Sequence, residues 1–333
     1  MKTKKLDIAL QGGGAHGAYS WGVLDRLLDD DRIEIDGICG TSAGAMNGVC
    51  AIYGLNKGGK NQAKHLLVKF WHKVSEAGKS SLLQPSIFDK MMSKGNMDFS
   101  PGYKFFSMTS EIMAPSQFNP LGLNPLEKIL NELIDFEELH RFNPPKLFVC
   151  ATNVLTCEPR IFGPTEISAK SIMASACLPY MYAAVEIDGE FYWDGGYMGN
   201  PPLEPLINNT EDTDDILLIQ INPFKIKVVP KTIEEIKDRV NEISFNSSLH
   251  HEIQQIEFKR TLVEKGITLD GAIKKTNLHC ISADHDLSEL NLSSKLNTSW
   301  DFLMHLKDLG YAACSKWLEE NYEDIGKIST LKI

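Results

Sequence analysis

Residues 33–44 read IEIDGICGTSAG, and this stretch decides the fold. The apolar run at 33–39 predicts a buried strand, and the alanine-containing stretch at 43–52 predicts a helix. Between them lies a G-x-S-x-G motif formed by Gly40, Thr41, Ser42, Ala43 and Gly44. A serine on a sharp turn between a strand and a helix is typical of a nucleophile elbow. The positive end of the helix dipole then favours negative charge that develops beside Ser42.

A run of glycines follows an earlier predicted strand at residues 6–10. It reads Gly12-Gly13-Gly14-Ala15-His16-Gly17 and contains the spacing G-x-G-x-x-G. One interpretation is a dinucleotide site, but the acidic residue that such a site places at the end of the second strand is here Asp36, inside that strand. The other interpretation is an oxyanion hole made of backbone N–H groups. Because the carboxyl ends of neighbouring parallel strands meet in one crevice, we expect this loop beside Ser42.

An aspartate much further along the chain is the candidate base for Ser42. Residues 191–193 form an aromatic, strand-like run, and Asp194 follows it, directly before Gly195 and Gly196. None of the nine histidines carries a catalytic signature, so the sequence gives no candidate for the histidine of a triad. An unperturbed aspartate has a pKa of about 3.9, so either burial raises the pKa of Asp194 or turnover is modest.

The rest of the hydrophobic pattern continues the alternation of strands and helices. Helices are expected at 18–28, 60–77, 126–139, 233–256 and 297–320, and strands at 147–151, 216–221 and 278–282. No linker divides the chain, so one domain over residues 1–333 is favoured. Its C-terminal part, 290–325, is expected to be a helical extension. The helix in that extension either packs on its own domain or forms a homo-oligomer interface.

Residues 80–125 differ in character from the rest of the chain. They are rich in Met and Phe and contain prolines at 85, 101, 115, 120 and 125, which break regular structure. Met and Phe provide adaptable apolar surface. We expect either an irregular but buried covering segment or a mobile lid that lines an acyl-chain channel.

Composition and charge exclude several classes of protein. The chain has 333 residues, of which 43% are hydrophobic and 23% charged, which is unlike a disordered chain or a coiled coil. A net charge of −10 without a basic run argues against nucleic-acid binding. Seven scattered cysteines without a C-x-x-C pair predict mostly buried, reduced thiols, and no histidine cluster has the spacing of metal ligands. We therefore expect no metal and no cofactor.

No apolar run is long enough to span a membrane, and residues 1–10 do not form a cleavable signal peptide. A cytoplasmic location, or a peripheral one at the membrane, is therefore expected. Delivery by a dedicated secretion machine stays open.

Taken together, these motifs resemble the bacterial patatin-like phospholipases. The resemblance is carried by the glycine loop at 12–17, the elbow at 40–44 and the DGG turn at 194–196, in that order. Two flanking stretches resemble the bacterial branch as well: ASA at 174–176 with Pro179, and GNPP at 199–202. The resemblance covers at least residues 6–222.

The resemblance implies a three-layer α/β/α fold with a central, mostly parallel sheet. It also implies a catalytic dyad, in which Ser42 attacks an acyl ester and Asp194 takes its proton, while amides of the 12–17 loop hold the oxyanion. The implied substrates are membrane phospholipids or other acyl-ester lipids, which bring the enzyme to a membrane surface. The family usually has Arg or Lys where this chain has His16. We expect a protonated His16 to supply part of that charge, which predicts activity that depends on pH near about 6–7.

Three alternatives to ester hydrolysis remain at this point. An acyltransferase would use the same residues, with an alcohol replacing water at the acyl-enzyme. A nucleotide-binding oxidoreductase would use the loop at 12–17. A binding or regulatory protein of weak catalytic activity would keep the fold, although the joint presence of Ser42, Asp194 and the glycine loop argues against it.

Overall fold

One mixed sheet forms the centre of the protein. The computed structural model describes residues 3–110, 112–119, 122, 124–142, 145–210, 212–267 and 275–331. The strand order is β5-β6-β3-β2-β1-β7-β8, and β4 pairs with β3. Five strands run parallel: β1 (Lys4–Leu10), β2 (Ile33–Thr41), β3 (Lys146–Asn153), β7 (Asp215–Gln220) and β8 (Asn277–Ser282). Antiparallel pairing joins β4 (Pro159–Phe162) and β6 (Glu190–Asp194) to β3, and β5 (Val185–Ile187) to β6.

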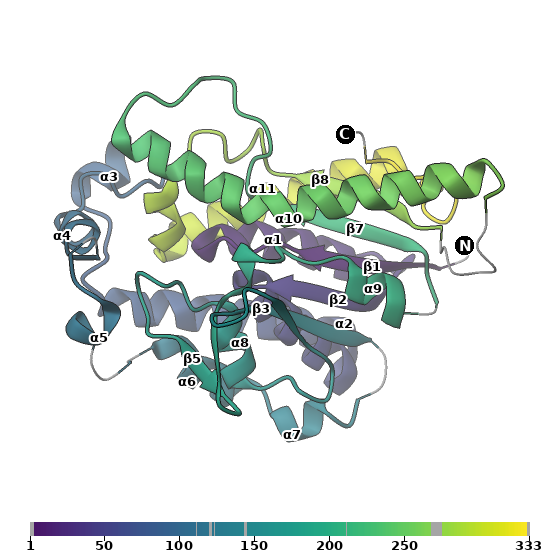
Figure 1. Cartoon of the computed structure of the whole chain (residues 1–333), viewed down its shortest axis with the longest axis horizontal. Coiled ribbons are helices and arrows are strands. Elements are labelled where there is room, and N and C mark those ends of the chain that lie inside the picture. The colour runs from purple at the N-terminus through teal and green to yellow at the C-terminus, as the bar shows by residue number, and fades with distance from the viewer. Residues whose placement is uncertain are drawn as a thin grey trace.

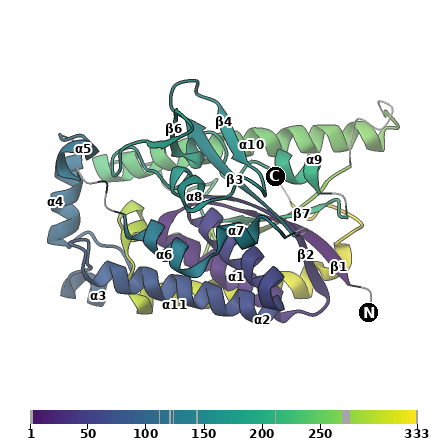
Figure 2. The same ribbon diagram turned by 90° about the horizontal axis from the view of Figure 1, so that it is seen from below.

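Helices cover both faces of this sheet (Figure 2). One face carries α1 (Gly17–Asp29), α2 (Ala43–Lys79), α6 (Pro125–Leu133), α8 (Ala169–Ser175) and α11 (Trp300–Asn321). The other carries α9 (Glu204–Asn209) and the long α10 (Ile233–Glu264). Side chains alternate along β1, so Ile8 and Leu10 enter the first core while Ala9 enters the second. The expected three-layer α/β/α fold with a mostly parallel sheet is confirmed.

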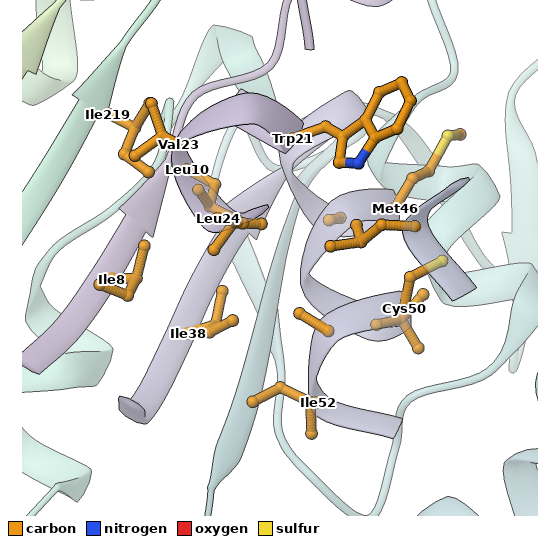
Figure 3. Close-up of a cluster of buried hydrophobic side chains, with 14 of the residues drawn as sticks. Ile8, Leu10, Trp21, Val23, Leu24, Ile38, Met46, Cys50, Ile52 and Ile219 are labelled. Carbon is orange, nitrogen blue, oxygen red and sulfur yellow. The ribbon is translucent and has the colours of Figure 1, made fainter. Parts of the chain in front are cut away.

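The larger core lies between the sheet and the helices α1 and α2 (Figure 3). Ile8, Leu10 and Ile38 from the strands meet Trp21 and Leu24 of α1, and all five side chains are almost fully buried. Burial of apolar side chains at this density stabilises the layers and holds the carboxyl ends of β1 and β2 in place. These two ends carry the glycine loop and the elbow.

Glycines allow a kink within α2 and a close contact between α1 and α11. In α2, Gly58 and Gly59 leave the helical region, so the helix is kinked between the two segments that the sequence predicted. Between α1 and α11, a Cβ at Gly22 would lie 1.9 Å from the Lys307 carbonyl oxygen, and one at Gly310 would lie 2.0 Å from the Tyr19 carbonyl oxygen. The two helices therefore touch backbone to backbone, and α11 packs on its own chain.

The predicted helix at 126–139 is two helices, α6 and α7 (Phe136–Leu139). Ile134 ends α6 in an extended conformation, and the Asp135 side chain accepts the Glu138 N–H at 3.0 Å. An N-cap of this kind satisfies the free amides of a new helix start, which explains the break.

Residues 80–119 contain short helices rather than irregular chain. They are α3 (Ile87–Met92), α4 (Pro101–Ser110) and α5 (Pro115–Phe118), and two of them begin at a proline, because proline suits the first turn. Pro120, which was expected to break structure, lies outside the described residues. In Figures 1 and 2 these helices lie at the end of the molecule opposite the N-terminus. We call the described residues of 80–119 the cap.

The cap is not the buried covering segment that was one of the two expectations. Nine of its large apolar side chains are between 56% and 82% exposed: Leu82, Ile87, Phe88, Met91, Met92, Phe99, Phe105, Met108 and Ile112. Other cap residues do pack against the rest of the chain: Met97 is fully buried, and its N–H donates to Ser293 Oγ at 2.8 Å.

All seven cysteines are free thiols. Five of them are buried, whereas Cys157 is exposed. Within the described residues, no helix is long and apolar enough to span a membrane.

Candidate active site

Ser42 stands on a strained turn between β2 and α2. Its backbone has φ 55° and ψ −120°, a conformation that costs energy for a residue with a side chain. The flanking glycines make the turn possible, because a Cβ at Gly44 would lie 2.2 Å from the Leu10 carbonyl oxygen. The Ser42 N–H donates to Ser175 Oγ at 2.8 Å, and the Thr41 hydroxyl donates to the Gly199 carbonyl at 2.7 Å. The predicted elbow geometry is present, and α8 and the 199–202 loop hold it.

Asp194 lies across β3 from this elbow. Thr41 pairs with Cys150 on one side of β3, and Asp194 pairs with Ala151 on the other. The Asp194 N–H donates to the Cys177 carbonyl at 2.8 Å, and the Thr152 hydroxyl donates to the Asp194 carbonyl at 2.8 Å. Two backbone contacts therefore fix the residue at the end of β6.

The Asp194 carboxyl is almost fully buried, at 1% exposure. Its Oδ1 accepts the Gly196 N–H at 2.8 Å, whereas Oδ2 has no hydrogen-bond partner of regular geometry among the described residues. Burial raises the pKa of Asp194 to about 7, against the opposing effects of the Gly196 amide, the nearby Ser42 hydroxyl and the charge of Lys295. Of the two expectations for this carboxyl, the raised pKa is the one found.

The glycine loop lies directly against Ser42. A Cβ at Gly12 would lie 2.7 Å from Ser42 Cβ, so no other residue fits there without movement. The Gly12 N–H is already engaged, since it donates to Asn200 Oδ1 at 2.7 Å. The His16 N–H donates to the Gly13 carbonyl. Within the described part of the chain, the Gly13 and Gly14 amides have no acceptor.

His16 is buried beneath the loop, at 3% exposure. Its Nε2 lies 2.7 Å from Ser294 Oγ, and that hydroxyl donates its single proton to the Asn291 carbonyl at 2.6 Å. Nε2 therefore carries the proton and donates. Burial, together with the charge of Lys295, lowers the pKa of His16 to about 3. The expectation that His16 becomes charged near neutral pH is wrong, because its site excludes the water that a cation needs.

The family model for patatin-like phospholipases matches residues 8–207, more than half of the chain. The chain belongs to the patatin-like phospholipase family. It is accordingly a lipid acyl-ester hydrolase. No curated protein sequence matches this chain.

Two solved structures are similar to this member of the family. VipD from Legionella pneumophila has 16% identity and a TM-score of 0.45, over 95% of this chain and 67% of that one. Full-length ExoU from the type III secretion system of Pseudomonas aeruginosa, solved with full-length SpcU, has 13% identity and a TM-score of 0.35. That similarity covers 96% of this chain and 53% of that one, so this chain spans about half the length of ExoU.

A buried polar network supports the glycine loop of this patatin-like chain. Gln11 Oε1 accepts the N–H groups of Ile221 and Asn222, both at 2.9 Å, and its amide donates to Asn246 Oδ1 at 3.0 Å. The Asn222 side chain donates to the Gly12 carbonyl at 2.7 Å. The network ties β1, β7 and α10 to the loop, so the loop is held from three elements.

Several of these supporting residues were not singled out from the sequence. Ser175 and Asn200 belong to the flanking stretches of the family resemblance, which could have identified them. Asn222 directly follows the predicted strand at 216–221, where polar residues at the carboxyl end of a parallel strand deserve inspection. Lys295 has no local signal in the sequence, because only folding brings it to the loop.

A cavity of about 650 Å³ lies between the cap and residues that flank Asp194 in the chain. Residues on both sides of Asp194 line it, and so does the cap: Ile112, Met113, Pro115, Trp193, Tyr197 and Met198. Ser42 and Asp194 themselves are not among its lining residues. Most of its lining is apolar, which suits a hydrocarbon chain.

His279 has a structural role. His279 Nε2 lies 2.9 Å from Asp215 Oδ1, and its Nδ1 lies 2.8 Å from the Thr330 hydroxyl, which joins β7, β8 and the C-terminal residues. Across the described ranges, no group of three or more His, Cys, Asp or Glu side chains is arranged to hold a metal ion.

Proposed function

We propose that this patatin-like enzyme is a phospholipase A or lysophospholipase that uses Ser42 as nucleophile and Asp194 as general base. The observation that carries the proposal is the Asp194 carboxyl, which is buried beside Ser42 with one unpaired oxygen and a pKa of about 7. A base with a pKa near the working pH accepts a proton efficiently yet is ionised often enough to act.

The proposed reaction has two halves with balanced proton transfers. Ser42 Oγ attacks the ester carbonyl carbon and gives its proton to Asp194 Oδ2. When the tetrahedral intermediate collapses, the C–O bond to the leaving alcohol breaks and that alcohol receives the proton. Water then attacks the acyl–Ser42 ester, gives its proton to Asp194, and the fatty acid leaves as the proton returns to Ser42 Oγ.

The oxyanion of each intermediate needs hydrogen-bond donors that are free before substrate binds. Within the loop predicted at 12–17, we propose the amides of Gly13, Gly14 and Ala15, because the amides of Gly12, His16 and Gly17 are engaged elsewhere. The N-terminus of α2, which begins at Ala43, adds a favourable dipole.

We propose that the cap contacts the lipid surface and that the cavity behind it takes an acyl chain. The cap presents nine large apolar side chains to solvent, and its residues 112–115 line the cavity. A chain with a net charge of −10 gains no attraction from an anionic membrane. Apolar contact is therefore the driving force for a peripheral association of this kind.

The decisive experiment is labelling with a fluorophosphonate probe in the presence and absence of phospholipid micelles, with the adduct located by mass spectrometry. We expect one adduct, on Ser42, that is absent from Ser42→Ala and strongly slowed in Asp194→Asn. Release of fatty acid from phosphatidylcholine, measured in parallel with and without an added alcohol, separates hydrolysis from acyl transfer. No adduct on Ser42 under either condition, together with no release of fatty acid, would overturn the proposal.

A further inference from the structure

A lysine from the C-terminal part of the chain lies over the glycine loop. Lys295 belongs to a short helical turn, η3 (Leu292–Leu296), beyond the residues that match the family model. Its backbone contacts the loop, because a Cβ at Gly14 would lie 2.4 Å from the Lys295 carbonyl oxygen. Its ammonium donates to Asn222 Oδ1 at 2.8 Å.

The Asn222 side chain connects Lys295 to the glycine loop. The opposite end of its side-chain amide donates to the Gly12 carbonyl at 2.7 Å. The Gly12–Gly13 peptide bond is trans, since the described chain has its one cis bond at Asn200–Pro201. In a trans peptide the C=O and the following N–H point in opposite directions. Holding the Gly12 carbonyl on the Asn222 side therefore turns the Gly13 N–H to the other side, where it has no acceptor.

Lys295 also brings a positive charge to the site. Its charge interacts electrostatically with Asp238 and Glu242 of α10, with the buried His16 and with Asp194. Burial lowers the pKa of Lys295, while the three carboxylates favour its charged form. The charge of Lys295 in turn lowers the pKa of Asp194 and that of His16. The lowered pKa of His16 leaves Lys295 as the candidate cation beside the loop.

We propose that Lys295 is a positioning residue for the hydrolysis: through Asn222 it orients the Gly12–Gly13 peptide as an oxyanion donor, and its charge favours both ionised Asp194 and the oxyanion. The inference rests on the proposed function and extends it. The positive charge of this site is supplied from position 295 instead of from the loop itself.

Other contacts hold the 291–297 segment in place, so a change at the ammonium is not expected to release it. Ser293 Oγ accepts the Met97 N–H at 2.8 Å and donates to Asp98 Oδ1 at 3.0 Å. The Asn297 side chain donates to the Gly95 carbonyl at 2.8 Å. These bonds do not involve the Lys295 side chain.

The test compares Lys295→Met with Lys295→Arg on a soluble, uncharged short-chain ester, so that membrane binding does not enter. For Lys295→Met we expect kcat to fall roughly 10²-fold with little change in KM, because an oxyanion donor loses its orientation. For Lys295→Arg, which keeps the charge, we expect most of the activity. Lys307→Met is the matched control, since Lys307 is a partly buried lysine that pairs with Asp25 at 2.8 Å, between α1 and α11.

The pH profile provides a readout that a purely structural role would not move. The acid limb of kcat/KM reports Asp194, whose carboxyl faces the Gly196 amide, Ser42, Lys295 and the uncharged side chains of Cys150, Cys177 and Tyr197. Loss of the Lys295 charge raises the pKa of Asp194. The acid limb should therefore move to higher pH in Lys295→Met and stay in place in Lys295→Arg and Lys307→Met.

A double variant that moves the lysine from position 295 to the glycine loop completes the test. The double variant His16→Lys with Lys295→Met has a lysine at the loop position where the family usually has Arg or Lys, and we expect partial recovery of kcat and of the acid limb. The proposal is overturned if Lys295→Met matches the wild type in kcat and acid limb, or if Lys295→Arg loses as much activity as Lys295→Met without moving the limb. If the wild type itself neither hydrolyses esters nor is labelled on Ser42, the proposed function fails as well.

Discussion

The dyad region and the cap lie side by side and are built in opposite ways. Around Ser42 and Asp194, backbone and side-chain contacts from β3, α8, α10 and the 199–202 loop fix nearly every polar group. Two buried atoms lack a partner among the described residues there, Asp194 Oδ2 and Asn200 Nδ2. The cap instead leaves its large apolar side chains in water. The cap lacks an apolar partner, and under the proposed function the acyl chains of a lipid surface provide one.

The largest effect on activity is expected from a substitution in the dyad. Asp194→Asn keeps the acceptor for the Gly196 amide but removes the base. We expect kcat/KM on a soluble ester to fall roughly 10²- to 10⁴-fold. Steady-state kinetics and the rate of Ser42 labelling check this. Equal labelling rates in the variant and the wild type would show that another group activates Ser42.

A smaller but still large effect is expected where the glycine loop touches the elbow. In Gly12→Ala the new methyl group would lie 2.7 Å from Ser42 Cβ and 2.8 Å from the Thr41 carbonyl oxygen, so loop and nucleophile must separate. We expect roughly 10²-fold slower labelling of Ser42. Gly163→Ala is the control, because its nearest atom would lie 3.7 Å away. A normal rate in Gly12→Ala would show that the spacing of loop and elbow does not limit the reaction.

On the apolar side, the expected effect depends on the substrate. The double variant Phe88→Gln with Met91→Gln removes two exposed apolar side chains from α3. We expect about 10-fold slower hydrolysis of phospholipid vesicles and an unchanged rate on a soluble ester, because only the vesicle requires apolar contact. Phe258→Gln on α10, at a side chain of 64% exposure, is the control. Equal losses on both substrates would contradict a role in surface binding.

The smallest expected effect concerns stability. The pKa of Asp194 is about 7 in the folded protein and about 3.9 in an unfolded chain, so the unfolded state loses its proton first as pH rises. The contribution of Asp194 to the free energy of unfolding is therefore fully present below about pH 4, and it is lost as pH rises through about 7. We therefore expect Asp194→Asn to raise Tm more at pH 8 than at pH 5. Thermal melts at both pH values check this, and equal shifts would show that the carboxyl is not buried as described.

Most of the fold was predictable because its signals are local. The strands at 6–10, 33–39, 147–151, 216–221 and 278–282 are apolar runs bounded by turns, and all five are present with slightly shifted ends. The helix at 126–139 was predicted as one because its apolar spacing continues through Asp135, whereas the cap made by that side chain divides it. Burial of the cap segment could not be judged, since Met and Phe are equally compatible with a core and with a lipid-binding surface.

The sequence by itself determined the elbow, the glycine loop and the DGG turn. Each is a short stretch whose residue types allow a strained serine, a close backbone approach or a carboxylate at a strand end. The tertiary structure decided the charge state of the site. Ser294 reaches His16 from 278 residues away, and Lys295 reaches Asn222 from 73 residues away. Burial and long-range contacts of this kind set the pKa of His16 and of Asp194, because the energy of a charge depends on everything packed around it and not on its neighbours in the chain.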